Sequence, residues 1–396
     1  MQRFSADWMV PVIGPPLRDA TITLDGAGRV LALEPGRHPE AEPIAGVVMP
    51  ALTNAHVHLE LSALRGRAPG GRGFLGWVVS MLAERQALGR EALRAAIPDA
   101  VAEAVRYGTA AVGDITNTLD AVPALAAAGL RGVVFHELLE RDDLEHGDAV
   151  AWARAQRAAI SDWPDGLAYA VAPHAPYSTS ADLIRRAMAA SPGVPTSIHV
   201  AEDPDELALL RDGSGPWPRI LTAFGVWERA EWVAGRGPVE HLDALGFLAR
   251  RPPPLLIHMV HASADELALV AAREATIVLC PRSNLHIGQE LADVPAMVGA
   301  GCRLALGTDS LSSNQTLSIF SEMAALARAF PALSRADIVR WATLGGASAL
   351  GLGEELGALA AGRQPGVIAV CGHAGADPYQ FLTEAEPEEV RWLSRA

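Results

Sequence analysis

The feature that most constrains this chain is a repeated alternation of short β-rich runs with longer helical stretches between about residues 46 and 350. We count eight β-rich runs, each followed within a few residues by polar or Gly- and Pro-containing sequence and then by a helical pattern. The runs are residues 46–50, 109–115, 132–138, 168–172, 196–200, 255–259, 276–279 and 303–307. Repeated strand–helix units indicate a parallel sheet, and eight of them predict a closed (β/α)8 TIM barrel in an α/β protein.

The two ends of the chain predict a second, smaller domain. Residues 20–24 and 29–33 are β-like and are separated by a turn rich in Asp and Gly, which indicates a hairpin. Another β-like run, residues 366–370, lies near the other end. We therefore predict that the two ends pair into a small β-sandwich-like domain beside the barrel. The predicted division is residues 1–45 and 356–396 for the small domain and 46–355 for the metal-dependent catalytic barrel.

Composition favours a well-packed protein with a small-molecule substrate. Half of the residues are hydrophobic but only 5% are aromatic, so Ala, Leu and Val must fill most of the core. The formal net charge of −14 and the absence of any run of Arg argue against nucleic acid, which binds to clustered positive charge. All 32 basic residues are Arg, which excludes every mechanism that needs a Lys.

No segment indicates export or a membrane span. Residues 1–16 lack the basic and apolar regions of a signal peptide, and no apolar stretch is long enough to cross a bilayer. The three cysteines, Cys280, Cys302 and Cys371, are far apart and lack CxxC spacing, which favours neither disulfides nor a thiolate zinc site. We expect a cytoplasmic protein with no membrane partner, and a homodimer remains open as its assembly.

Histidine and acidic residues gather where the predicted strands end. In a barrel of this kind the active site lies at the carboxyl ends of the strands, so polar residues at these positions are the candidates for chemistry. They are His56 and His58 after the first run, His174 after the fourth, His199 in the fifth, His258 in the sixth and Asp309 after the eighth. The roles of His261 and His241 are left open.

Four of these residues form a candidate metal site. A His-x-His motif is weak by itself, because short motifs need a structural context. However, alternate residues leaving a strand point the same way, so His56 and His58 can face one ion while His199 and Asp309 converge on it from other strands. Imidazole and carboxylate ligands favour Zn²⁺, with Fe²⁺ and Mn²⁺ as alternatives. The competing interpretations are ordinary loop histidines and, for Asp309, a helix N-cap.

The segments around these residues form a recognisable set. They are residues 49–58 (MPALTNAHVH), 199–202 (HVAE), 257–258 (IH), 280–284 (CPRSN) and 306–309 (LGTD). In combination they resemble the amino-heterocycle deaminase branch of the amidohydrolase superfamily. Relatives that use two metals bridge them with a carboxylated Lys, which this chain lacks, so the resemblance implies a single ion. One departure is residues 362–366, GRQPG, where the family usually has Gly-Lys-x-Ala-Asp.

The resemblance also implies catalytic roles. The ion would lower the pKa of a water molecule towards neutrality. Glu202, three residues beyond His199, would protonate the ring nitrogen of an amino-heterocycle as the water attacks the amino-bearing carbon. Asp309 would move a proton to the departing ammonia, and His258 would orient or polarise the attacking oxygen. The alternative for Glu202 is a solvated acid at the start of a helix.

Several stretches resemble one subgroup, the aminodeoxyfutalosine deaminases of the futalosine route to menaquinone. They are residues 73–77, 175–178, 288–291 and 309–314, the last of which contains Ser313. The implied substrate is an adenine nucleoside with a carboxyphenyl-ketone arm. His174 matches a substrate-contacting position of the family, and Ser313 is a further candidate contact. Trp77 could stack on the arm or the ring, and Arg282 could pair with the carboxylate. The loop at residues 212–217 is expected near the pocket mouth.

Other functions remain open at this stage. Adenosine, S-adenosylhomocysteine and guanine-like rings are alternative substrates for a deaminase. The same fold and ion could also hydrolyse a cyclic amide or a chlorinated heterocycle. A scaffold protein without catalysis is disfavoured, because a scaffold has no need for the full set of ligands together with Glu202.

Overall fold

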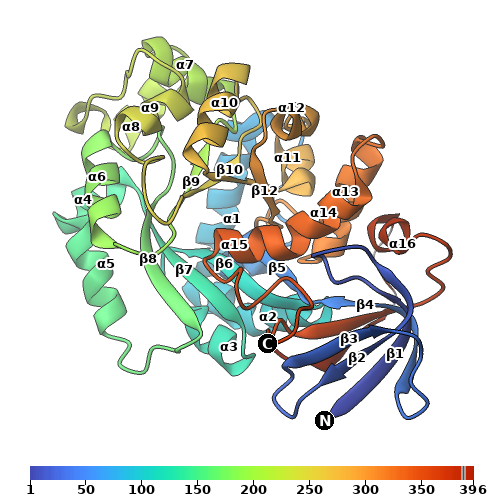
Figure 1. The fold of residues 1–396 in the computed structure, drawn as a ribbon. Coiled ribbons are helices and arrows are strands. Elements are labelled where there is room, and N and C mark those ends of the chain that lie inside the picture. Colours follow the sequence, from blue (N-terminus) through green and yellow to red (C-terminus); the bar gives the residue numbers. More distant parts are fainter. Residues whose placement is uncertain (385–386, 388) are drawn as a thin grey trace.

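The structure, a computed structural model, describes residues 1–384, 387 and 389–396. Its centre is a barrel of eight parallel strands (Figure 1), which pair by hydrogen bonds in two halves of four strands. One half contains β5 (Leu52–Val57), β6 (Thr109–Thr116), β7 (Arg131–Leu138) and β8 (Leu167–Pro173). The other contains β9 (Ser197–Val200), β10 (Leu255–His258), β11 (Thr276–Leu279) and β12 (Arg303–Leu306). The predicted barrel is confirmed.

Backbone hydrogen bonds at the carboxyl ends join the two halves. The N–H of His199 donates to the carbonyl of His174 at 2.9 Å, which ties the end of β9 to the end of β8. On the opposite side, the N–H groups of Thr308 and Asp309 both donate to the carbonyl of His56 at 3.1 Å. The barrel therefore closes through the residues that the sequence assigns to chemistry.

Helices follow the barrel strands and surround the barrel. Those between β5 and β9 are η1 (Leu59–Leu64), α1 (Gly73–Ala95), α2 (Ile97–Arg106), α3 (Val122–Ala127), α4 (Glu140–His146), α5 (Ala149–Ala158) and α6 (Ala181–Ala190). Those between β9 and β11 are α7 (Pro204–Asp212), α8 (Trp217–Ala223), η2 (Trp227–Arg229), α9 (Pro238–Ala244) and α10 (Ala264–Arg273). Those after β11 are α11 (Pro281–Ile287), α12 (Val294–Gly299), α13 (Ile319–Ala329), α14 (Arg335–Arg340), η3 (Trp341–Gly345), α15 (Gly346–Ala349) and α16 (Pro378–Glu384).

Side-chain caps fix where several of these helices begin. The Ser180 hydroxyl accepts from the N–H of Leu183 at the start of α6. At the start of α10, Ser263 and Glu266 form a reciprocal capping box. Such caps satisfy N–H groups that the first turn of a helix leaves free. No helix of the described residues has the length and apolar character needed to cross a membrane.

The small domain is a six-stranded mixed sheet built from both ends of the chain, beside the barrel in Figure 1. Its strand order is β14-β13-β4-β1-β2-β3. The strands are β1 (Gln2–Met9), β2 (Leu17–Leu24), β3 (Val30–Pro35), β4 (Glu42–Pro50), β13 (Val367–Cys371) and β14 (Val390–Ser394). The predicted hairpin is confirmed as the antiparallel pair β2–β3, and the two chain ends meet where β13 pairs with β4.

The predicted first barrel strand, residues 46–50, is wrong. These residues belong to β4, which pairs with β1 on one side and with β13 on the other. The chain passes from the small sheet into the barrel at Ala51, whose N–H donates to the carbonyl of Gly366. The first barrel strand is β5, and the predicted boundary between residues 45 and 46 falls inside β4. Residues 46–50 are predicted as the barrel strand because they are almost wholly apolar. The true first strand, β5, contains the polar residues Thr53, Asn54 and His56, which are buried.

The small sheet and the barrel share one hydrophobic core. Val47 and Met49 of β4 and Ile368 of β13 are buried in the same cluster as Leu52 of β5 and residues of the surrounding helices. The barrel interior is filled largely by small and branched side chains such as Ala55, which suits a chain with few aromatic residues. Burial of these apolar surfaces fixes the small domain against the first strand of the barrel.

Gly307 permits the close approach of the chain after β12 to β5. A Cβ atom at this position would lie 2.7 Å from the carbonyl oxygen of His56 and 3.0 Å from its nitrogen. We predict that Gly307→Ala lowers the free energy of unfolding by about 1–3 kcal/mol, because backbone atoms would have to move. Denaturant unfolding measures this loss. Gly299→Ala is the control, since a Cβ there meets nothing within 4 Å. Equal stability of the two variants would contradict the prediction.

Candidate metal centre and active site

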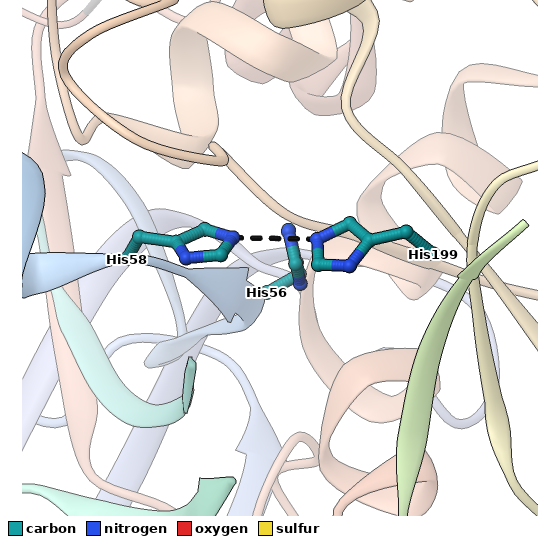
Figure 2. A group of neighbouring side chains, drawn as sticks. All are labelled: His56, His58 and His199. Carbon is teal, nitrogen blue, oxygen red and sulfur yellow. Dashed lines mark hydrogen bonds between the residues drawn. The ribbon is translucent and has the colours of Figure 1, made fainter. Parts of the chain in front are cut away.

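Three histidines from two distant strands converge at the carboxyl end of the barrel. His56 and His58 come from the end of β5, and His199 comes from β9. The Nε2 atoms of His58 and His199 lie 3.3 Å apart, and Figure 2 shows the His56 ring between these two rings. One ligand nitrogen from each ring lies within 4.8 Å of the other two. The predicted convergence of the three imidazoles is therefore present.

Asp309 completes the group from the segment after β12. Its Oδ1 atom lies 3.6 Å from Nε2 of His56 and 3.6 Å from Nε2 of His58. Its Oδ2 atom accepts hydrogen bonds from the hydroxyls of Ser283 at 2.5 Å and Ser313 at 2.9 Å. Burial opposes ionisation of this carboxyl, but the neighbouring His56 and His58 outweigh it and hold its pKa well below the usual value. Asp309 therefore presents an anionic oxygen to the histidines.

The chemistry of these four residues fits a divalent cation. Both ring nitrogens of the fully buried His56 lack a hydrogen-bond partner among the described residues, which is costly unless another group satisfies them. Burial, followed by the nearby His56, lowers the pKa of His58 to about 3, so its ring is neutral as a ligand must be. The Nδ1 atom of His199 bonds to the carbonyl of His174 at 2.9 Å, which directs Nε2 towards His58.

A second group of possible metal ligands overlaps the first. It contains Glu137, His174 and His199, with ligand atoms again within 4.8 Å of one another. Glu137 Oε1 lies 3.6 Å from His199 Nδ1, but that nitrogen already bonds to the carbonyl of His174. Glu137 Oε1 is also buried without a hydrogen-bond partner among the described residues, but we assign Glu137 to the surroundings of His199, because the nitrogen that it faces is already bonded to the carbonyl of His174.

Glu202 and His258 face each other beside the histidine cluster. The Oε1 atom of Glu202 lies 3.4 Å from Nε2 of His258, whose Nδ1 atom bonds to the side-chain amide of Asn284 at 3.1 Å. The Glu202 side chain is only 7% exposed, so it is not a solvated acid at a helix start. Burial, and then the charge of Asp309, raises the pKa of Glu202 well above its usual value. Burial thus favours the protonated form of Glu202, which is the form that can act as an acid.

The backbone is unusual where these residues leave their strands. Positive φ angles occur at Ala201 (52°), His258 (74°), Met259 (54°) and Asp309 (55°). Non-glycine residues rarely adopt this conformation, and it concentrates at functional sites. The positions flank the histidine cluster, so backbone strain accompanies the placement of the reactive side chains.

A cavity of about 160 Å³ opens beside Glu202. It is lined on other sides by Phe74, Asn284, His261 and Glu290. The Nε2 atom of His261 lies 3.7 Å from Oε2 of Glu290. A ligand in this cavity would contact the proton-bearing Glu202 directly.

The structure places two of the predicted substrate contacts close to the site, His174 against the histidine cluster and Trp77 against Phe74 of the cavity wall. His174 packs against His199 with ring centroids 4.9 Å apart, and its Nδ1 bonds to the Ser178 hydroxyl at 2.5 Å. Trp77 of α1 is buried beside Phe74, and its Nε1–H donates to the carbonyl of Ser312 at 3.4 Å. Trp77 belongs to a buried aromatic cluster, and His174 contacts Tyr177 of the same cluster. Contact with substrate stays a prediction for both residues.

The other two predicted contacts are engaged within the protein. Ser313 donates to Asp309, so it supports the carboxylate rather than lying free in the cavity. The Nε–H of Arg282 donates to Asn314 Oδ1 at 3.0 Å and lies 3.7 Å from the buried carboxylate of Glu322. A role for either residue in binding substrate stays a prediction. The loop at residues 212–217 connects α7 to α8, and its place near the pocket mouth stays a prediction.

Sequence reasoning missed four supporting residues. Ser283 holds Asp309, Asn284 holds His258, and Glu206 accepts from the backbone N–H of Glu202 at 3.2 Å. Ser283 and Asn284 belong to the CPRSN segment that carries the resemblance, but neither the segment nor the position of Glu206 on a helix indicates which side chain each residue contacts. Glu137, in contrast, lies near the end of β7 and could have been found by the same strand-end rule that selected His174.

Comparison with known proteins agrees with this geometry. The family model described as the Amidohydrolase family matches residues 47–388. The aminodeoxyfutalosine deaminase of Deinococcus radiodurans is 35% identical over 327 residues, which cover 79% of this chain and 76% of the relative. The 5-methylthioadenosine/S-adenosylhomocysteine deaminase of Syntrophobacter fumaroxidans is 31% identical over 337 residues, covering 82% of this chain and 72% of the relative.

A solved structure shows the same fold over almost the whole chain. The Helicobacter pylori aminofutalosine deaminase in complex with methylthio-coformycin has a TM-score of 0.83 and 22% identity, with coverage of 99% of this chain and 98% of that chain. It confirms the predicted barrel. The family match and the named relatives confirm the predicted hydrolytic deaminase of the amidohydrolase type. The chain belongs to the amidohydrolase family.

Proposed function

We propose that this amidohydrolase removes the 6-amino group of an adenine-type nucleoside, converting 6-amino-6-deoxyfutalosine to futalosine and ammonia in menaquinone biosynthesis. The observation that carries the proposal is the buried Glu202, which lies 3.4 Å from His258 at the edge of the His56, His58, His199 and Asp309 cluster and whose pKa burial raises. A protonated carboxyl at this place suits a substrate ring that must accept a proton as water attacks it.

The donor set also supports a resident ion. His56, His58, His199 and Asp309 would hold one divalent metal, and we propose zinc, with iron and manganese as alternatives. Such an ion would act as a Lewis acid that makes a water molecule a better nucleophile. We also propose the cytoplasm as the compartment, since Cys280, Cys302 and Cys371 are all free thiols.

The reaction then uses this chain's own groups to move protons. As water attacks the amino-bearing carbon, Glu202 donates its proton to the adjacent ring nitrogen. Asp309, whose lowered pKa keeps it ionised, accepts a proton from the attacking water and passes it to the amino group. His258, fixed by Asn284, hydrogen-bonds the attacking oxygen. The carbon–nitrogen bond breaks and ammonia leaves. The second proton of the water passes from the oxygen to Glu202, which restores the acid, and the ring carbon keeps the oxygen as a carbonyl.

The choice of substrate rests on the relatives and on the subgroup resemblance. The relative that shares 35% identity carries the aminodeoxyfutalosine deaminase name, whereas another at 31% is named for 5-methylthioadenosine and S-adenosylhomocysteine. All of these substrates share the adenine ring that Glu202 would protonate. We favour aminodeoxyfutalosine because the name of the first relative matches the subgroup that the stretches at residues 73–77 and 309–314 resemble.

Glu202→Gln removes the proposed acid while keeping its shape. We predict that kcat falls by about 10²–10⁴-fold, because general acid catalysis contributes on this scale. Steady-state ammonia release measures the change, and metal analysis accompanies it. The metal content should be unchanged, since Glu202 is not among the four ligands. Glu34→Gln, an exposed acid in the small sheet, is the matched control. Loss of metal in Glu202→Gln, or undiminished turnover, would show that the role is wrong.

A substrate panel tests the proposed function directly. Metal-loaded protein is incubated with aminodeoxyfutalosine, 5′-methylthioadenosine, S-adenosylhomocysteine, adenosine and guanine, and ammonia is followed. We predict the highest kcat/KM for aminodeoxyfutalosine, with Glu202→Gln as the inactive control. A higher value for another adenine nucleoside would reassign the substrate. If no member of the panel releases ammonia, the deaminase proposal fails.

A further inference from the structure

A second and larger cavity lies on the same rim of the barrel as the histidine cluster. Its volume is about 630 Å³. Glu60, Thr118 and Arg141, which line it, follow the carboxyl ends of β5, β6 and β7 respectively. The remaining wall comes from α1, the start of α2 and Phe224 after α8. A molecule bound at the histidine cluster could therefore extend along this rim.

The charge of this cavity contrasts with that of the whole chain. Arg85, Arg90, Arg94 and Arg141 line it, whereas Glu60 and Asp120 are its acidic residues. In a chain with a formal net charge of −14, this excess of positive charge is local. Such a cavity attracts an anion, and guanidinium groups match the planar geometry of a carboxylate.

The acidic residues leave part of this positive charge uncompensated. Arg90 forms two hydrogen bonds with Asp120, both at 3.2 Å, and Arg85 pairs with Glu60 at 3.3 Å. Arg94 has neither an ion pair nor a side-chain hydrogen bond with any described residue.

Arg141 also has donors to spare. It uses its Nε–H for Glu145 at 2.6 Å, and Glu145 does not line the cavity. Its terminal N–H groups and the whole guanidinium of Arg94 thus have no partner in the cavity.

The arginines of α1 share this cavity because the helix is kinked. Arg85 and Arg94 are nine residues apart, which in a straight α-helix places them on roughly opposite faces. Gly89, which also lines the cavity, breaks the helix with φ 74° and ψ 164°. A positive φ of this kind favours glycine, so the kink is specified by the residue type. The break turns the two halves of α1 towards a common space.

A continuous set of contacts connects the cavity to the histidine cluster. Glu60 lies two residues beyond His58, and its Oε2 accepts from the N–H of Asn117 at 3.0 Å. The Asn117 side chain donates to Glu137 Oε2 at 3.3 Å, and Glu137 Oε1 lies 3.6 Å from His199. Glu60, Asn117 and Glu137 thus follow one another along the rim from the arginines to the proposed metal ligand His199.

We propose that this arginine-lined cavity binds the carboxylate of the substrate, with Arg94 and Arg141 as its main partners. The inference rests on the proposed function, since the arm of aminodeoxyfutalosine ends in a carboxyphenyl group. Adenine nucleosides without a carboxylate gain no binding energy from these arginines. The cavity would therefore favour aminodeoxyfutalosine over such nucleosides. Arg282, the earlier candidate for this pairing, is held instead by Asn314 and Glu322.

Kinetics of two substrates test the assignment. Arg94→Gln, Arg141→Gln and the double variant are compared with wild type on aminodeoxyfutalosine and on adenosine. We expect kcat/KM for aminodeoxyfutalosine to fall about tenfold or more, mainly through KM, because a charge-assisted hydrogen bond is lost. The value for adenosine should stay within about twofold. Arg328→Gln, at an exposed Arg of α13, is the control. Equal losses on both substrates, no loss in the double variant, or the same selective loss only in Arg282→Gln would overturn the proposal.

Ligand binding separates this inference from the proposed function. Calorimetric titration with benzoate should show saturable binding to wild type and to Arg328→Gln, and weaker binding to the double variant. No benzoate binding to wild type would overturn the assignment of the cavity. If inorganic phosphate binds as tightly as benzoate and the variants have normal kinetics, the cavity binds a free anion and not the carboxylate of the substrate. Failure of wild type to release ammonia from either nucleoside would refute the proposed function instead.

Discussion

The carbonyl of His56 holds the site together. It accepts hydrogen bonds from the N–H groups of both Thr308 and Asp309, and these bonds close the barrel between β5 and β12. The same contact brings the carboxylate of Asp309 to within 3.6 Å of the His56 and His58 rings. Gly307 is the residue that allows the segment after β12 to approach β5 this closely. Closure of the fold and assembly of the candidate metal site are therefore one structural event.

Two carboxyl groups in this site acquire opposite properties from their surroundings. Asp309 lies among histidines and accepts two hydroxyl hydrogen bonds, and its pKa is held well below the usual value. Glu202 is buried without such support, and burial together with the charge of Asp309 raises its pKa well above the usual value. One group is thus ready to accept a proton while the other is ready to donate one. This division is what a hydrolytic deamination needs, since a proton must leave water and another must reach the ring.

The sequence predicts most of the fold because the strand–helix alternation repeats, and most of the reactive residues because they end strands. His56, His58, His199 and Asp309 all obey that rule and meet in the structure. The rule fails for residues that act from helices, such as Ser283 and Asn284. It also misplaces the first strand, because the apolar end of β4 looks more like a barrel strand than β5, with its buried Asn54, does. The arginine-lined cavity depends on the kink at Gly89, which no periodicity reveals.

The most direct test of the central claim is the metal content of the purified chain, measured by elemental analysis after removal of loosely bound ions. The account predicts one divalent ion per chain in the wild type. It also predicts loss of that ion in His56→Ala and in His199→Ala, and its retention in Glu137→Gln. The absence of a bound ion in wild type, two ions per chain, or an ion that persists in both histidine variants would contradict the account.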